Sequence, residues 1–185
     1  MEIVRPANIK PVRKPNAGET GAGSFCVTIE ASMPSEIDAI SPLIDQLMRL
    51  IEGSCCITGS EFAVELALRE ALNNAVVHGN AMDHHKLVKV RCRCEPGKGD
   101  WLAVRDQGKG FDPNAVSDPM EPNNLKAEQG RGIYLMKWAM DQVVFKVGGT
   151  EVWMWKAAAH DGRPEAANQA LTGRPHSKKA ARKPH

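Results

Sequence analysis

The sequence predicts an α+β domain, a two-layer sandwich in which helices cover one face of a mixed, mostly antiparallel sheet. Residues 86–107 and 142–157 each contain two strand-like segments joined by a short turn, as in a β-hairpin. Three segments with apolar residues at helical spacing precede or separate these hairpins. The 185 residues, 42% of them hydrophobic, suffice for one domain with a core and some unstructured chain.

The first elements are a strand and a helix. Residues 24–31 (SFCVTIEA) alternate and are rich in β-branched side chains, which predicts a strand. Apolar residues then recur at helical spacing over residues 35–52. Ser35 can cap this helix and Gly53 can end it, whereas Pro42 predicts a kink or a restart.

A second helix is predicted from about Ser60 to His78, after a segment with capping-box spacing (TGSE, residues 58–61) and before Gly79, a candidate helix terminator. The first hairpin follows. Residues 111–129, rich in Pro, Asn and Asp, are long for a structureless connection, so we expect a functional lid or a disordered segment. Residues 130–140 predict a third helix, and the second hairpin closes the domain.

Composition divides the chain into three parts. Residues 1–23 hold four Lys/Arg and two Asp/Glu, residues 157–185 hold six and two, and both segments predict disordered extensions. The domain at residues 24–156 is therefore mildly acidic, which argues against direct nucleic-acid binding by the folded part. The basic ends either bind a partner or are solvated charge runs.

Cysteines and hydropathy predict a cytoplasmic protein. The charged start of the chain lacks the apolar run of a signal peptide, and no stretch is long enough to span a bilayer, so no membrane association is expected. Five cysteines, an odd count, fit free thiols in a reducing compartment. Cys92 and Cys94 share a strand face, but their spacing does not favour zinc.

The segment ALREALNNAVVHGN (residues 67–80) places polar residues on an otherwise apolar helix. Glu70 and Asn74 are four residues apart, which in a helix is an offset of about 40° and a rise of roughly 6 Å, so both can point into one site. A carboxylate there can act as a general base, and an amide oxygen can ligate Mg²⁺. The alternative is structural: Glu70 pairs with Arg69 or a nearby Lys, and Asn74 caps a neighbouring group.

Two further segments point to the same chemistry. Asp106 lies at a strand end, where it can accept a hydrogen bond from an exocyclic amine such as that of adenine, and Gly108 and Gly110 let the backbone approach a flat base. Taken alone, this pattern is also ordinary turn chemistry.

The third helix begins with Gly130, Arg131 and Gly132. The amides at a helix N-terminus suit phosphate, glycines leave the approach open, and an Arg can add charge to a terminal phosphate. The alternative is a plain hinge and helix start. Together, the three segments predict a nucleotide site. The chain has no P-loop, no dinucleotide-binding glycine motif after a strand and no eukaryotic-kinase motif set.

The segments EALNNAVVHGN, DQGKGFDP and GRGIYLM resemble the N, G1 and G2 boxes of the gyrase/Hsp90/histidine-kinase/MutL (GHKL) ATPases. The short lid narrows the resemblance to anti-sigma factor serine/threonine-protein kinases, over about residues 24–156. The resemblance implies a Bergerat-type ATP-binding fold, with ATP and Mg²⁺ as ligands. It also implies that Glu70 is the catalytic base and Asn74 the magnesium ligand.

The resemblance carries roles to further residues. Asp106 would bind the adenine amine in a pocket shaped by Gly108 and Gly110. Thr150 matches a threonine that contacts adenine through water. Phosphates would be held under the lid by Gly130, Arg131 and Gly132. Asn73 and His78 would be polar neighbours of the site.

In function, the resemblance implies transfer of the γ-phosphate of ATP to a serine of a small anti-sigma-factor antagonist, and sequestration of a sigma factor. Members of this family tend to dimerise, which leaves a homodimer open here. Two alternatives remain. The chain could bind ATP and sequester a partner without phosphorylating it, or it could be the catalytic domain of a sensor histidine kinase. Gyrase- or MutL-type ATP hydrolysis is disfavoured because no transducer domain follows.

Overall fold

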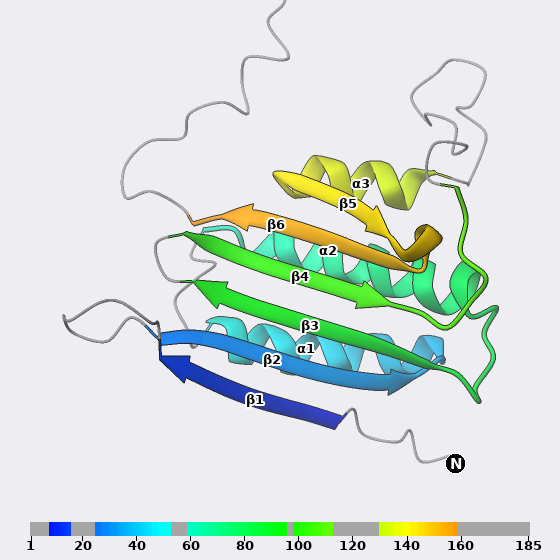
Figure 1. Cartoon of the computed structure of the whole chain (residues 1–185), viewed down its shortest axis with the longest axis horizontal. Coiled ribbons are helices and arrows are strands. Elements are labelled where there is room, and N and C mark those ends of the chain that lie inside the picture. The colour runs from blue at the N-terminus through cyan, green and yellow to red at the C-terminus, as the bar shows by residue number, and fades with distance from the viewer. Residues whose placement is uncertain (1–7, 16–24, 53–58, 96–97, 113–129, 159–185) are drawn as a thin grey trace, which may run out of the picture.

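A computed structural model describes residues 8–15, 25–52, 59–95, 98–112 and 130–158. Its centre is a single six-stranded sheet in the order β1-β2-β3-β4-β6-β5, in which every described pairing is antiparallel (Figure 1). The strands are β1 (Asn8–Pro15), β2 (Phe25–Pro34), β3 (Leu87–Glu95), β4 (Gly99–Arg105), β5 (Gln142–Lys146) and β6 (Glu151–Ala157). The predicted α+β fold and both predicted hairpins are confirmed.

Three α-helices lie on one face of the sheet (Figure 1). They are α1 (Ile40–Glu52), α2 (Glu61–Asn73) and α3 (Arg131–Ala139). The 3₁₀ turn η1 (Ile37–Ala39) precedes α1, so Pro42 falls in the first turn of α1, where no backbone N–H is required. Within the described ranges, no helix is long and apolar enough to cross a membrane.

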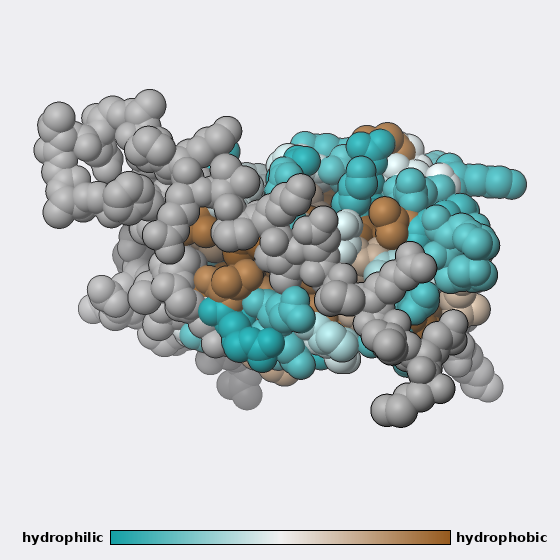
Figure 2. All heavy atoms as spheres, turned by 90° about the horizontal axis from the view of Figure 1, so that it is seen from below, coloured by the Kyte–Doolittle hydropathy of each residue, from teal (hydrophilic) through white to brown (hydrophobic). Residues whose placement is uncertain are grey.

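The core lies between the helices and the inner face of the sheet. Along β3, side chains alternate between exposed and buried, and Val88, Val90, Cys92 and Cys94 point inward. Opposite them are fully buried helix side chains, each of which contributes roughly 1.5–3 kcal/mol by its burial. The largest are Leu43, Ile44, Leu47, Ile51, Leu68, Leu72 and Met136. In the view of Figure 2 the coloured surface is largely hydrophilic, with separate hydrophobic areas between the hydrophilic side chains.

The expectation of disorder over residues 1–23 is wrong for Asn8–Pro15. These residues form β1, and every residue of β1 pairs with β2. The prolines in this segment argued against a strand, because proline is depleted in sheets. An edge strand has a partner on one side only, so it tolerates prolines that a central strand would not. The rest of the predicted N-terminal extension, the predicted lid at residues 113–129 and residues 159–185 lie outside the described residues.

Asp100 is a buried acidic residue at the start of β4, with 1% of its surface exposed. Its Oδ1 atom has no hydrogen-bond partner among the described residues. Burial raises the pKa of Asp100 to about 6, an effect partly opposed by a hydrogen bond from Cys94. Burial, reinforced by the charge of Asp100, also raises the pKa of the Cys92 thiol to about 12, so this thiol stays protonated and unreactive.

The buried Asp100 predicts a pH-dependent stability. Between about pH 4 and pH 6 the folded chain keeps a proton on Asp100 that the unfolded chain has lost, so stability falls as the pH rises through this window. We expect the free energy of unfolding of the wild type to fall by up to about 3 kcal/mol relative to Asp100→Asn. Urea unfolding at several pH values measures this difference. Parallel curves for the two proteins would show that Asp100 titrates normally.

Candidate functional site

The C-terminal half of α2 meets the first turn of α3. A Cβ at Gly132 would lie 2.8 Å from Oε2 of Glu70 and 3.2 Å from both amide atoms of the Asn74 side chain. Glu70 and Asn74 therefore face the beginning of α3, where a side chain would not fit between them and the helix. The spacing of these two residues thus does place them in one site.

The end of β4 meets the same region from the other side. A Cβ at Gly79 would lie 2.5 Å from Cγ of Asp106, and a Cβ at Gly108 would overlap the carbonyl oxygen of Gly79. The three segments singled out in the sequence thus lie together around one end of α2. Gly79 does end the helical segment, but it does not have the positive φ of a helix-terminating glycine. It is required because Asp106 packs directly against it.

Residues Asn74–Gly79 form a π-helical turn, η2, that continues α2. The N–H of Asn80 donates to the carbonyl of Ala75, five residues earlier, at 2.8 Å. A π-turn contains one residue more than an α-turn, and such turns occur frequently at functional sites. Here it widens the helix at the point where Asp106 and Gly108 approach.

Asn80 was not among the predicted site residues, although it is fully buried. Its Nδ2 donates to the carbonyl of Leu87 at 3.3 Å, and its Oδ1 accepts the N–H of Gln107 at 2.7 Å. Gln107 in turn accepts the N–H of Leu87 at 2.6 Å. Asn80 therefore joins the end of the π-turn to the start of β3 and to the turn that carries Asp106. A polar residue after a glycine resembles ordinary loop chemistry, so its position in the sequence gave little signal.

Asp106 is partly buried at the end of β4. Burial raises the pKa of its carboxyl, and the N–H of Gly108, which donates to Oδ1 at 2.7 Å, opposes this shift, as do the positive charges of Lys86 and Arg105. One carboxylate oxygen is thus held by the turn, and the group as a whole remains an acceptor for a donor that enters the site.

Thr150 lies beside this turn. Its carbonyl accepts the N–H of Asp106 at 3.0 Å, its hydroxyl donates to the carbonyl of Val147 at 3.0 Å, and its methyl would lie 3.1 Å from a Cβ at Gly110. Gly110 itself has φ of 74° and packs against the 3₁₀ turn η5 (Val147–Gly149). The second hairpin therefore supports the predicted adenine-binding turn, and Thr150 is placed at its edge.

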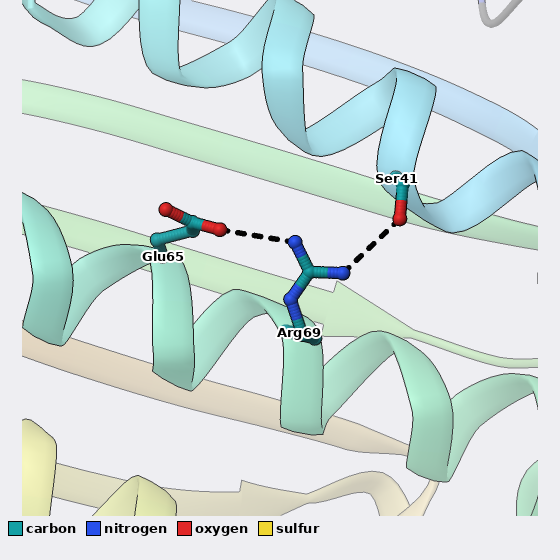
Figure 3. Close-up of polar contacts among 3 residues, drawn as sticks. All are labelled: Ser41, Glu65 and Arg69. Carbon is teal, nitrogen blue, oxygen red and sulfur yellow. Dashed lines mark hydrogen bonds and ion pairs between the residues drawn. The ribbon is translucent and has the colours of Figure 1, made fainter.

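The structural alternative for Glu70 is an ion pair with Arg69, and the contacts of Arg69 argue against it. The guanidinium of Arg69 forms an ion pair with Glu65 at 3.0 Å and donates to the hydroxyl of Ser41 on α1 at 3.1 Å (Figure 3). Arg69 thus bridges α2 to α1 and does not pair with its neighbour in sequence. Among the residues that the structure describes, Glu70 makes no ion pair, so its carboxylate is left for the space in front of α3.

The remaining predicted residues differ in how close they lie to the start of α3. Gly130, with φ of 90°, is the N-cap of α3, and Arg131 is the exposed first residue of that helix. The first N–H groups of a helix have no partner within it, which suits an anion. Asn73 is partly buried beside Asn74, whereas His78 is exposed on η2.

A helix with a carboxylate and an amide facing the first turn of a second helix, next to an acidic turn, is the arrangement that the resemblance to GHKL-type ATP-binding domains predicts. A family model described as the histidine kinase-like ATPase domain matches residues 33–156. This match covers more than half of the chain, so the chain belongs to the histidine kinase-like ATPase family and is an ATP-binding domain. A comparison with curated proteins found no match. The individual roles of the site residues stay predictions.

We expect Asn80→Ala to weaken ATP binding and to lower the free energy of unfolding by about 1–3 kcal/mol, because it leaves the Gln107 N–H and the Leu87 carbonyl without their buried partner. Isothermal titration with ATP and urea unfolding measure the two effects. Lys137→Ala, an exposed position on α3, serves as the control. Unchanged ATP affinity in a folded Asn80→Ala protein would show that Asn80 has no part in shaping the site.

Gly132→Ala should reduce ATP affinity about tenfold or more while the fold is retained, since the new methyl group would meet Glu70 and Asn74. Lys137→Ala is the control, because it also places an alanine in α3 but at an exposed position. Titration of each variant with ATP and magnesium measures the effect. Equal losses in both variants would contradict the proposed closeness of α3 to the Glu70 side chain.

Proposed function

We propose that the protein is an ATP-dependent serine/threonine-protein kinase that acts as an anti-sigma factor. In this proposal it phosphorylates a serine of a small antagonist protein and sequesters a sigma factor from RNA polymerase. The observation that supports a kinase is the Glu70 carboxylate, which faces the start of α3 beside Asn74 while Arg69 is bound to Glu65 and Ser41. A module that only bound ATP would need no such base.

Each residue has a task in this chemistry. Glu70 would accept the proton of the attacking serine hydroxyl, for which it must come within hydrogen-bond reach of that group. The first amides of α3 and Arg131 would hold the phosphates, and Asp106 would accept the adenine amine. Phosphoryl transfer depends mainly on alignment and on neutralising charge, which amides and an arginine at fixed positions provide.

The residues present fit a magnesium ion. Mg²⁺ prefers oxygen ligands and keeps most of its shell as water and phosphate oxygens, so a single neutral amide oxygen such as that of Asn74 is sufficient from the protein. Asn74 would hold the ion next to the α3 N-terminus, where Gly132 leaves room. When bound, the ion would neutralise charge on the transferring phosphate.

Antagonist and sigma factor enter the proposal through the resemblance of the three boxes and the short lid to anti-sigma factor kinases. Recovery of the protein with its partners from the native cell tests this part directly. We expect a sigma factor and a small antagonist to accompany it. A response regulator in their place would favour a histidine kinase, and a sigma factor bound by a chain that transfers no phosphate would favour a sequestering module.

Labelled ATP, magnesium and the recovered antagonist test the kinase reaction. We expect serine labelling that Glu70→Gln lowers by about a hundredfold or more, the loss typical of a missing general base, with ATP affinity little changed. Glu65→Gln is the matched control, because it lies on the same helix but faces Arg69. Tight ATP binding without any transfer by the wild type would reject the kinase, as would full activity in Glu70→Gln.

A further inference from the structure

The face of the sheet opposite the helices carries a second cluster of side chains that the ATP site does not use. Inward positions of β4 and β6, such as Leu102 and Met154, pack in the core. The alternate positions therefore point away from the helices. Three tryptophans occupy them, with Trp101 directly opposite Trp155 and Ala103 directly opposite Trp153 in the strand register.

These tryptophans form one apolar area. The ring centroids of Trp101 lie 6.2 Å from Trp153 and 6.1 Å from Trp155. Val144 of β5 extends the area, because it lies opposite Trp153 and is 47% exposed. We call Trp101, Ala103, Val144, Trp153 and Trp155 the tryptophan face.

The Nε1 of Trp153 lacks a hydrogen-bond partner among the described residues. A buried indole N–H normally has one.

The outer side of the sheet beside the tryptophan face carries more cations than carboxylates. Its register neighbours on the outer side of the sheet include the cations Lys89, Arg91, Arg93, Arg105 and Lys146 and the carboxylates Glu30, Glu95 and Glu151. Two of these carboxylates pair with two of the cations, Glu30 with Arg91 and Glu95 with Arg93, which leaves three cations against Glu151. The outer side of the sheet is thus net positive, although the folded domain as a whole is mildly acidic.

The positive charge beside the tryptophan face favours some binding partners over others. A second copy placed face to face would bring two positive surfaces together, and the chain's own C-terminal residues 159–185 are also basic. Single-stranded nucleic acid needs free ring faces for stacking. Here Lys146 lies over the ring of Trp153 at 4.0 Å from its centroid, and Trp101 and Trp153 pack edge to face, so the faces of these rings are partly covered. An acidic protein surface would be attracted to the positive charge and does not need free ring faces for base stacking.

We propose that the tryptophan face binds an acidic segment of a partner protein, whose apolar side chains lie on the tryptophans and whose carboxylates meet Arg91 and Lys89. Tryptophan and arginine are the residues in which binding energy at protein interfaces concentrates. The face is on the side of the sheet away from α2 and α3, so the partner and ATP occupy separate surfaces. The inference stands independently of the kinase proposal.

Photo-crosslinking tests the proposal. The full chain, carrying p-benzoylphenylalanine in place of Val144, is irradiated in its native cells and the crosslinked peptide is sequenced. Phe62, which is 71% exposed on α2, is the control position. We expect a segment rich in Asp/Glu and apolar residues at Val144 and not at Phe62. The chain itself, a nucleic acid, a lipid, a basic segment or no product at Val144 would overturn the proposal.

A synthetic peptide of the crosslinked segment then measures the affinity. In a Trp138→Phe background the fluorescence comes only from Trp101, Trp153 and Trp155, because the chain has four tryptophans. We expect the peptide to shift their emission, and the double variant Lys89→Glu/Arg91→Glu to weaken binding about tenfold or more. Arg49→Glu on α1 should leave binding unchanged. Equal affinity in the charge-reversed and wild-type proteins, each shown to be folded by its ATP affinity, would overturn the proposal.

Discussion

The close packing of two segments against the end of α2 is the constraint on which the site depends. A methyl group at Gly132 would meet the carboxylate of Glu70, and one at Gly79 or Gly108 would overlap Asp106 or the backbone of Gly79. Contacts this close place the first turn of α3 against Glu70 and Asn74, and the Asp106 turn against Gly79 at the end of η2. The glycines of this region thus act through their small size, and only some, such as Gly110 and Gly130, also need a positive φ.

Periodicity explains why so much of the fold could be predicted. The spacing of apolar residues identified α2 and α3, and strand-like alternation beside turn residues identified both hairpins. Spacing alone also placed Glu70 and Asn74 on one side of a helix. What could not be predicted depends on contacts between distant segments. An edge strand with prolines was taken for disorder, and Asn80 was missed because its partners, Leu87 and Gln107, become neighbours only after folding.

The two faces of the sheet contact different parts of the molecule and its surroundings. The inner face holds the core and supports the elements of the candidate ATP site, and the outer face carries the tryptophan face beside an excess of cations. Strands β4 and β6 contribute to both, because alternate residues of each point to opposite sides. Asp106, which follows β4 directly, is thus joined by a short length of backbone to Trp101 and Ala103. The backbone bond from Asp106 to Thr150 couples β4 and β6 at the ATP-binding end of the sheet.

The π-helical turn at Asn74–Gly79 has an evolutionary consequence. Each residue of a helix turns the chain by about 100° and advances it by 1.5 Å. A π-turn accommodates one residue more than an α-turn, so loss of one residue here would restore a regular helix and remove the wider turn against which Asp106 and Gly108 pack. Surface loops can change in length at little cost, whereas loss of a single codon in this turn would change which of its atoms meet Asp106 and Gly108.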